Sequence, residues 1–359
     1  MKKYKYEFLY FNIDSKEMKI AIIGGGWFGC HIGNELLKEG HEIVIYERER
    51  EIFSGASGAN QNRLHLGYHY PRSHITREQS KKGFNIFKKK YSYFSKKIKN
   101  NIYAISSEKE SIIDFETYIQ ILKSSRLPFK VLDPKKNEIK NIEGLIKCPE
   151  EYIDIYKVKS FFEKKLRKNI IYNFDVKKIL KKKDKILINN NYYDFVVNCT
   201  WQQLYINKKW KLKYELCIST LYKAVKNFDS AITIMDGPFF TLYPWGSKQF
   251  NLYSVKHSRY KNANKFEKIK YDLKKIKREH LNEIRRKMEN EFSHYYPDFK
   301  KKFKFIKFLK TFRTIIERNN HSRNYQYSYN DRVFNILSGK VDHIFLAYTD
   351  LKKCLRNFL

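Results

Sequence analysis

The chain has 359 residues, 42% of them hydrophobic and 16% aromatic, a composition that supports one or two packed domains and excludes a disordered chain. No apolar run reaches the roughly 18 residues needed to span a bilayer, and the N-terminus lacks the pattern of a secretory signal. We therefore expect a cytoplasmic protein without a membrane span. The five cysteines are scattered and none forms a C-x-x-C pair, so the sequence predicts no metal site and no disulfide framework.

The formal net charge of +35 is the most unusual bulk property of the chain. Its lysines are spread along the sequence in short runs, such as residues 88–90 and 181–183, between apolar and aromatic residues. This pattern favours solvated lysines over a nucleic-acid site, and the chain has no recognisable nucleic-acid module. We expect no specific nucleic-acid partner, whereas a positive field would attract an anionic small molecule.

The first persuasive elements follow residues 1–17, which show no clear pattern and are expected to be an N-terminal extension. A buried strand is predicted over 19–23, and it ends in glycines. A helix is expected over 30–39, with Gly40 as its C-terminal cap. A second strand over 42–47 ends in the acidic residue Glu47. Together these segments predict a β-α-β unit.

The turn between the first strand and the helix carries the motif G-x-G-x-x-G at Gly24, Gly26 and Gly29. In this context, with an acidic residue about twenty positions later, the motif predicts a dinucleotide site. Gly24 permits the tight turn, Gly26 lets the backbone approach a pyrophosphate at the helix N-terminus, and Gly29 lets the helix pack closely on the sheet. Glu47 can accept hydrogen bonds from the adenosine ribose. Further cofactor contacts are expected from Trp27, Phe28 and Arg48.

Residues 54–71 favour a flavin over a nicotinamide cofactor. The segment is rich in Gly, Ser and Asn, and it runs into two histidines and two tyrosines, unlike the same place in a typical NAD dehydrogenase. Small, hydroxyl and amide side chains suit a backbone that wraps the second phosphate and the ribityl chain of FAD. Here the chain resembles the D-amino acid oxidase-like superfamily of FAD-dependent oxidoreductases, whose corresponding loop runs under the flavin. The cofactor contacts predicted in this segment are Ser57, Asn60, Gln61, Asn62 and Arg63.

Two segments in the middle of the chain resemble the same superfamily, in the same order. Val176 lies in a segment similar to the strand whose backbone contacts the adenine. Thr200 and Trp201 follow the apolar run 195–198, where the superfamily places a small-residue turn beside the cofactor. The superfamily usually has Gly at the position of Trp201. The resemblance therefore implies cofactor contacts at Val176, Thr200 and Trp201.

The C-terminal segment 334–344 resembles the final strand, turn and helix that close over the flavin ring. A helix N-terminus there would stabilise negative charge on the reduced flavin. The usual glycine-rich turn is reduced to Gly339, and Lys340 can supply positive charge instead. The contacts expected at this end are Gly339, Lys340, Val341 and Asp342.

The remaining pattern completes an α/β fold. Helices are predicted over 77–99, 114–125, 156–168, 266–292 and 342–356, and strands over 195–198 and 333–337. The resemblance implies a Rossmann-like FAD-binding domain of the glutathione-reductase type, interleaved with a mixed-sheet substrate domain. The FAD-binding segments are expected at 18–75, 150–205 and 325–359, and the substrate-domain segments at 76–149 and 206–324.

The substrate side is predicted from residue types suited to proton transfer and anion binding. His65 and His69 are predicted to be catalytic, because imidazole exchanges protons near neutral pH and their loop leads from the ribityl chain toward the flavin ring. Tyr243 is expected to wall the opposite side, and Arg259 to anchor an anionic group of the substrate. Further candidates are Tyr68 and His257, with Arg313 and Arg323 as clamps for a carboxylate or phosphate.

The resemblance implies oxidation of a C–N or C–O bond of a small molecule, by hydride transfer to non-covalently bound FAD. Relatives with a loop like the one at 65–71 look like enzymes of surface-polysaccharide or secondary metabolism, which suggests an amino sugar or another sugar derivative. Two alternatives stay open. One is a flavoenzyme without net substrate oxidation, of the UDP-galactopyranose mutase type. The other is a basic protein that binds nucleic acid or membrane and retains a vestigial fold.

Overall fold

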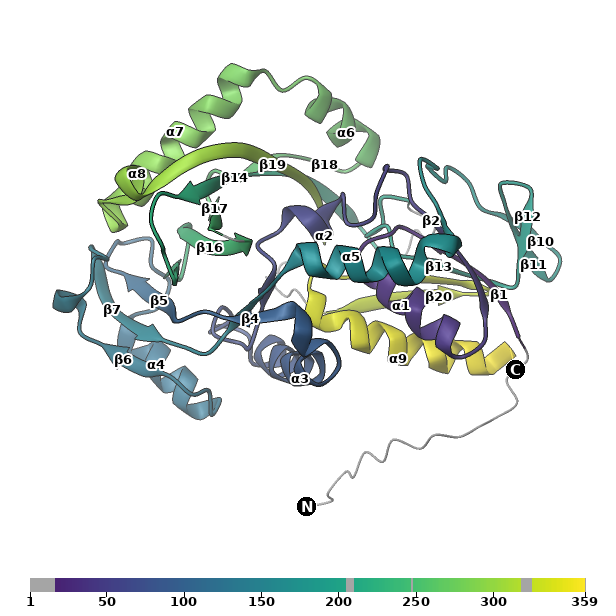
Figure 1. Ribbon diagram of the computed structural model, residues 1–359, viewed down its shortest axis with the longest axis horizontal. Coiled ribbons are helices and arrows are strands. Elements are labelled where there is room, and N and C mark those ends of the chain that lie inside the picture. The colour runs from purple at the N-terminus through teal and green to yellow at the C-terminus, as the bar shows by residue number, and fades with distance from the viewer. Residues whose placement is uncertain (1–16, 205–209, 247, 318–324, 359) are drawn as a thin grey trace, which may run out of the picture.

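The computed structural model describes residues 17–204, 210–246, 248–317 and 325–358, and it consists of two large β-sheets with their helices (Figure 1). The expected N-terminal extension lies outside these ranges except for Glu17, and so does Arg323, one of the predicted anion clamps. None of the described helices is both long enough and apolar enough to cross a membrane.

The first sheet contains the predicted β-α-β unit. Its six strands lie in the order β20-β21-β13-β1-β2-β9, and all neighbours are parallel except β20 and β21. The central strands are short and almost wholly apolar, as parallel strands are when both faces of the sheet are covered. The strands are β1 (Lys19–Ile23), β2 (Glu42–Tyr46), β9 (Ile170–Ile171), β13 (Phe195–Asn198), β20 (Gln326–Asn330) and β21 (Val333–Leu337).

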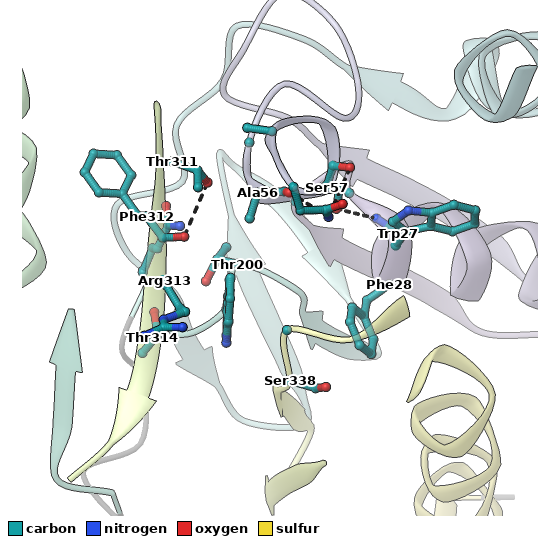
Figure 2. A pocket seen from close by; sticks show the side chains of 18 of the residues that line it. Trp27, Phe28, Ala56, Ser57, Thr200, Thr311, Phe312, Arg313, Thr314 and Ser338 are labelled. Carbon is teal, nitrogen blue, oxygen red and sulfur yellow. Dashed lines mark hydrogen bonds between the residues drawn. The ribbon is translucent and has the colours of Figure 1, made fainter. Parts of the chain in front are cut away.

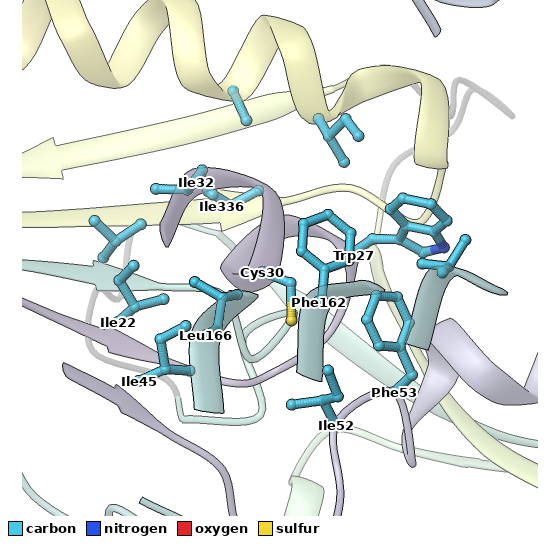
Figure 3. Packing of buried hydrophobic residues seen from close by; sticks show 14 of the residues in the cluster. Ile22, Trp27, Cys30, Ile32, Ile45, Ile52, Phe53, Phe162, Leu166 and Ile336 are labelled. Carbon is cyan, nitrogen blue, oxygen red and sulfur yellow. The ribbon is translucent and has the colours of Figure 1, made fainter. Parts of the chain in front are cut away.

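Helices cover one face of this sheet, and a small antiparallel sheet covers the other. On the helical face, Ile22 and Ile45 pack in one cluster with Phe162 (Figure 3). Ala21 and Ile23 point to the opposite face, because side chains alternate along a strand. The helices are α1 (Trp27–Lys38), α3 (His74–Tyr91), α5 (Ile155–Leu166) and α9 (Ile344–Leu355), and the small sheet is β10 (Leu180–Lys182), β11 (Lys185–Ile188) and β12 (Asn191–Tyr193).

The second sheet has nine strands in the order β18-β14-β17-β16-β15-β5-β7-β6, with β19 also paired to β14. It is mixed, since β5 and β15 are parallel while their other neighbours are antiparallel. Met288 and Phe292 of α7 pack on it, and Phe266 of α6 packs beside β14. The strands are β5 (Asn100–Ser106), β6 (Lys130–Leu132), β7 (Ile142–Lys147), β14 (Leu212–Ala224), β15 (Ser230–Met235), β16 (Phe240–Gly246), β17 (Gln249–Ser254), β18 (Arg259–Ala263) and β19 (Phe303–Ile316). The helices are α4 (Phe115–Ser124), α6 (Phe266–Lys274), α7 (Arg278–Tyr295) and α8 (Phe299–Lys302).

Short elements connect the two sheets. α2 (Ala56–Ala59) contacts β19, so the segment after β2 reaches from the first sheet to the second. β3 (Arg63–Leu64) pairs with β8 (Glu151–Ile153), which also pairs with β4 (Ser95–Lys97). The α/β class and the mixed second sheet are as predicted from the sequence.

The predicted elements differ from the observed ones mainly at their ends. The strands at 19–23, 195–198 and 333–337 have the predicted bounds. The helix predicted over 266–292 is wrong as a single element, because it is broken at residues 275–277 into α6 and α7. The two halves pack on different places: α6 contacts β14 and β18, and α7 packs in the cluster that contains Phe240.

The boundaries of the two domains stay a prediction, and α3 bears on the first of them. Phe87 and Tyr91 of α3 belong to the core cluster of the first sheet, where Phe87 contacts the ring of Trp27 and Tyr91 stacks on Phe345. A boundary after residue 75 would separate this helix from its own core. We therefore propose that the FAD-binding part includes α3 and that the chain first enters the second sheet at β5.

Replacement of Phe162 by Ala should lower the free energy of unfolding by about 3–5 kcal/mol, since a buried Phe leaves a cavity when it is truncated. Its ring is fully buried and contacts the rings of Trp27, Phe53 and Tyr91. Denaturant titration measures the change. The control is Tyr192→Ala, which removes a ring that is 55% exposed and should change stability by under about 0.5 kcal/mol. Equal losses in both variants would show that this cluster is not the core.

Candidate active site

A cavity of about 580 Å³ lies between the two sheets. It opens at the carboxyl ends of the parallel strands β1, β2, β13 and β21, where open α/β sheets bind their ligands. Figure 2 shows residues 311–314 of β19 facing Ala56, Ser57 and Phe28 across it. One wall therefore comes from the dinucleotide-binding half and the other from the nine-stranded sheet.

The turn between β1 and α1 has the conformation that the glycine motif predicts. Gly24 has φ +103°, a region that L side chains rarely adopt. A Cβ on Gly29 would lie 2.0 Å from the carbonyl oxygen of Gly24, so the helix can approach the strand only with glycine there. The N-cap of α1 is Gly26, which has no side chain to cap the first turn. The backbone N–H groups at the start of this helix are suited to binding an anion.

Glu47 is held in place at the end of β2. Its Oε2 accepts a hydrogen bond from the backbone N–H of Gly25 at 2.7 Å, and its Oε1 accepts one from the N–H of Glu49 at 3.0 Å. Burial raises the pKa of Glu47 above its ordinary value, while these backbone hydrogen bonds act to lower it. A carboxylate has further lone pairs on both oxygens. Glu47 therefore lines the cavity in a fixed orientation and can still accept hydrogen bonds from ribose hydroxyls.

Ser57 links the loop after β2 to the start of α1. Its Oγ accepts a hydrogen bond from the backbone N–H of Trp27 at 3.0 Å (Figure 2). The ring of Trp27 points away from the cavity and meets Phe53 and Phe162 edge-on in the core (Figure 3). Trp27 therefore lies at the cavity with its backbone, whose N–H donates to Ser57, while its ring belongs to the core.

The C-terminal turn approaches the cavity next to Trp201. A Cβ on Gly339 would lie 2.4 Å from the Trp201 ring, so Gly339 is required by close packing. Trp201 itself has φ +54°, which explains why glycine is usual at this position in the superfamily. Lys340 lies 8% exposed, with its Nζ 3.7 Å from the centre of the Tyr70 ring. This geometry places a cation and an aromatic ring together at the end of the cavity.

His65 and His69 lie together at the same end. Their ring centres are 5.7 Å apart, and the ring of Tyr70 lies 5.1 Å from that of His65. The side chain of His65 is 18% exposed, and burial lowers its pKa below the ordinary value. His65 is therefore predominantly neutral at pH 7 and can accept a proton.

The structure brings most of the predicted site residues to the cavity, with three exceptions. The lining includes His65, His69 and Arg259 of the predicted catalytic residues, and Gly24, Gly26, Trp27, Phe28, Glu47, Arg48, Ser57, Asn60, Gln61, Asn62, Arg63, Val176, Thr200, Trp201, Gly339, Lys340 and Val341 of the predicted cofactor contacts. Gly29 lies behind the glycine turn and Asp342 is buried against Gly83 of α3. Tyr243 is the third exception.

Tyr243 lies beneath the cavity wall. The guanidinium of Arg63 lies 4.0 Å from the centre of its ring, and its hydroxyl donates to the carbonyl oxygen of Glu151 at 3.2 Å. Arg63 also donates to Thr233 at 2.9 Å and to the hydroxyl of Tyr103. Arg63 thus ties its loop to the nine-stranded sheet, with Tyr243 buried below it.

The other candidates for anion binding and proton transfer are spread apart. Arg313 lines the cavity, but its Nε donates to Glu215 at 2.6 Å, so its charge is already paired. Arg259 is exposed and donates to the carbonyl oxygen of Val255. His257 faces Glu291 of α7, and the hydroxyl of Tyr68 donates to a backbone carbonyl away from the cavity.

Several polar residues of the second sheet line the cavity and were not among the predicted site residues. Asn251 donates to the Oγ of Ser219 at 2.8 Å, and its own Oδ1 has no hydrogen-bond partner among the described residues. A polar residue inside an apolar strand was the available signal, as in the run Phe250-Asn251-Leu252. The residues that the predictions omitted include Ser219, Thr241, Asn251, Tyr253, Thr311, Thr314 and Ser338.

The fold, with its parallel sheet and its mixed sheet, and the glycine-lined cavity between them are those of a dinucleotide-binding flavoprotein. The family described as "FAD dependent oxidoreductase" (DAO) matches residues 19–298, and the chain belongs to this family. It is an FAD-dependent oxidoreductase, as the resemblance implied. The alternative of a basic binding protein with a vestigial fold is thereby set aside.

Similar proteins agree with this assignment. The chain is 32% identical to the FAD-dependent monooxygenase FPY4 of Fusarium mangiferae over 92% of its own length and 89% of that protein. It is 24% identical to the FAD-dependent monooxygenase kojA of Aspergillus flavus over 92% of its length and 84% of that protein. Its fold is similar to that of glycine oxidase from Geobacillus kaustophilus (TM-score 0.72, 12% identity, 95% of each chain) and of FAD-bound L-α-glycerophosphate oxidase from Mycoplasma pneumoniae (TM-score 0.72, 14% identity, 95% of each chain).

The cavity residues fit FAD. The N-terminus of α1 and the glycine turn would hold the pyrophosphate, and Glu47 the ribose hydroxyls. The C-terminal turn with Lys340 would lie at the flavin end, where positive charge stabilises the reduced cofactor. When bound, FAD supplies the chemistry of accepting a hydride from the substrate.

We predict that Gly26→Val abolishes FAD binding while leaving most secondary structure intact. A Cβ at this position would lie 2.6 Å from the Oγ of Ser57, so a side chain displaces the loop that forms one wall of the cavity. The ratio of flavin to protein absorbance measures occupancy, and circular dichroism checks folding. Combining Gly26→Ala with Ser57→Gly relieves this contact and should restore part of the FAD. Full occupancy in Gly26→Val would refute the assignment of the glycine turn.

Proposed function

We propose that the protein oxidises a C–N or C–O bond of a small polar substrate, with hydride transfer to FAD and proton transfer to His65. The observation that carries this proposal is the position of His65 and His69 at the end of the cavity that also holds Lys340. Neutral imidazole next to a flavin site is suited to removing a proton from an amine or hydroxyl while the adjacent carbon loses a hydride.

Each residue at this end has a distinct part in the proposal. His65 accepts the proton, and its low pKa keeps it in the basic form at neutral pH. The ammonium of Lys340 favours negative charge on the reduced cofactor. The ring of Tyr70 packs against both side chains, which limits the space open to water.

We propose an amino sugar or a related polyhydroxylated amine as the substrate class. The wall opposite the glycine turn is rich in uncharged hydrogen-bonding groups, among them Ser219, Asn251 and Thr311. Buried polar groups favour ligands that can pair with them. The pairing of Arg313 with Glu215 favours such a substrate over a simple carboxylate. A panel of amino sugars, amines, sugars and amino acids tests this proposal, because a substrate bleaches the flavin under anaerobic conditions. Amino sugars should bleach it faster than amino acids.

A second candidate is oxygen insertion into the substrate, and it is favoured by the monooxygenase names of the relatives FPY4 and kojA. The two reactions are distinguished by the fate of oxygen. An oxidase releases hydrogen peroxide in proportion to the substrate consumed, whereas a monooxygenase incorporates ¹⁸O from ¹⁸O₂ into the product. Turnover without net oxidation would instead support the mutase type.

His65→Asn should lower the rate of substrate-driven flavin reduction about 100-fold, the lower end of the usual contribution of a general base, while FAD stays bound. His69→Asn is the matched variant from the same loop, and it tests whether the second imidazole shares the role. Stopped-flow spectroscopy under anaerobic conditions measures the step directly. Normal reduction rates in both variants would refute proton transfer to this loop.

We expect the FAD to be bound non-covalently. Cys199 and Cys217 line the cavity, but burial raises the pKa of the Cys199 thiol, which keeps it protonated and unreactive. Acid precipitation should therefore leave the flavin in the supernatant, with the mass of intact FAD. A yellow pellet that retains flavin on a cysteine peptide would contradict this prediction.

We also propose a reducing, cytoplasmic location with no specific nucleic-acid partner. The five cysteines are free thiols, four of them buried, which suits a compartment that keeps thiols reduced. Fractionation of the source cells tests the location.

A further inference from the structure

Behind His65 lies a carboxylate that was not among the predicted site residues. The side chain of Glu150 is fully buried, and its Oε1 lies 3.8 Å from the Nδ1 of His65. This separation is longer than a hydrogen bond. Catalytic hydrogen bonds often tighten when the substrate binds.

Glu150 also holds the turn that carries His65. Its Oε1 accepts hydrogen bonds from the backbone N–H groups of Leu66 at 2.7 Å and Gly67 at 3.3 Å. Gly67 has φ +125°, so this turn needs glycine. On the other side, Oε2 accepts the hydroxyl hydrogen of Tyr103 and lies 4.0 Å from the Nη1 of Arg63. The carboxylate is therefore fixed from both sides.

We propose that Glu150 is the positioning residue for His65: it accepts the Nδ1 proton, so that the Nε2 lone pair of the imidazole is available to the substrate. This inference rests on the proposed function. During oxidation the substrate's N–H or O–H proton moves to Nε2 of His65, and its hydride moves to FAD. Glu150 stays ionised throughout and stabilises the imidazolium that forms.

The charges around His65 support this assignment. Burial lowers the pKa of His65, Glu150 raises it, Arg63 lowers it and Asp342 raises it. Burial raises the pKa of Glu150, but His65, Arg63 and Tyr103 outweigh burial and hold it below the ordinary value. His343 also interacts with His65, but burial lowers the pKa of His343 to about 4, so His343 is neutral at pH 7. Among the described residues, Glu150 is the carboxylate that lies 3.8 Å from a ring nitrogen of His65.

The test is a pH titration of the His65 ring by NMR in holoenzyme labelled with ¹⁵N-histidine, with His65→Asn for assignment. Glu150→Gln keeps the oxygen that accepts from Leu66 and removes the charge, so the pKa of His65 should fall. The matched control is Glu151→Gln, the next carboxylate along the chain, which is paired with Lys88 at 2.7 Å. There the pKa of His65 should not move. An unchanged pKa in Glu150→Gln, or equal changes in both variants, would overturn the proposal.

If Glu150→Gln does not give folded holoenzyme, Glu150→Asp is titrated in its place. The shorter side chain withdraws the carboxylate from Nδ1, so the pKa of His65 is again expected to fall. An unchanged pKa in this variant would equally overturn the proposal.

The rate of substrate-driven flavin reduction provides the second arm. In Glu150→Gln the rate should fall about tenfold or more, as expected when a general base is weakened. The pH below which the reduction rate declines should also be lower, because the imidazolium of His65 is less stable without the carboxylate. A changed His65 pKa with normal reduction would uphold the pairing and refute His65 as the base. A slower reduction with an unchanged His65 pKa would refute the pairing of Glu150 with His65, and it would leave the role of His65 as the base untouched.

Discussion

The buried charges of Arg63 and Glu150 determine how the cofactor loop meets the nine-stranded sheet. Both side chains are almost completely excluded from solvent, at 2% and 0% exposure. Burying charges is costly unless they are paired and hydrogen-bonded, and removing one partner leaves the other uncompensated. The two Nη atoms of Arg63 donate to Tyr103 and Thr233 and the guanidinium lies over the ring of Tyr243, so these contacts tie the loop to the sheet. The end of the cavity where His65 lies follows from these contacts.

The glycine turn depends on sterics, and this is why the sequence predicted it well. Gly24 is required by its own positive φ, and Gly29 by its contact with Gly24 inside the β-α-β unit, so short-range sequence carries this information. A Cβ on Gly26 would instead meet Ser57, which lies outside the unit. Short-range sequence also indicates strands such as 195–198, whose continuous apolar runs reflect burial on both faces. Local patterns therefore predicted the dinucleotide-binding half almost to the residue at several elements.

The substrate-side wall depends on contacts between distant segments, which a single sequence does not reveal. Tyr243 was predicted to face the substrate, yet Arg63, 180 positions earlier, covers its ring. Glu150 had no local motif, and its importance comes from contacts with His65 and Tyr103 on other elements. The break between α6 and α7 has the same origin, since each half packs on a different part of the sheet. Residue type alone indicated candidates, and packing decided among them.

The high net charge of the chain comes largely from exposed lysines, and the charged groups at the cavity are arranged differently. Many lysines form exposed ion pairs, such as Lys19 with Glu42, and exposed pairs contribute little to stability. Several charged side chains also line the cavity, and the basic residues Arg313, His65 and Lys340 have defined neighbours. Arg313 is paired with Glu215, burial keeps His65 neutral, and the ammonium of Lys340 lies over the ring of Tyr70, close to the proposed flavin end. In a cavity partly shielded from water a single charge acts strongly. A neutral base and a nearby cation can therefore act together: the base receives the proton while the cation stabilises the electrons that move to the cofactor.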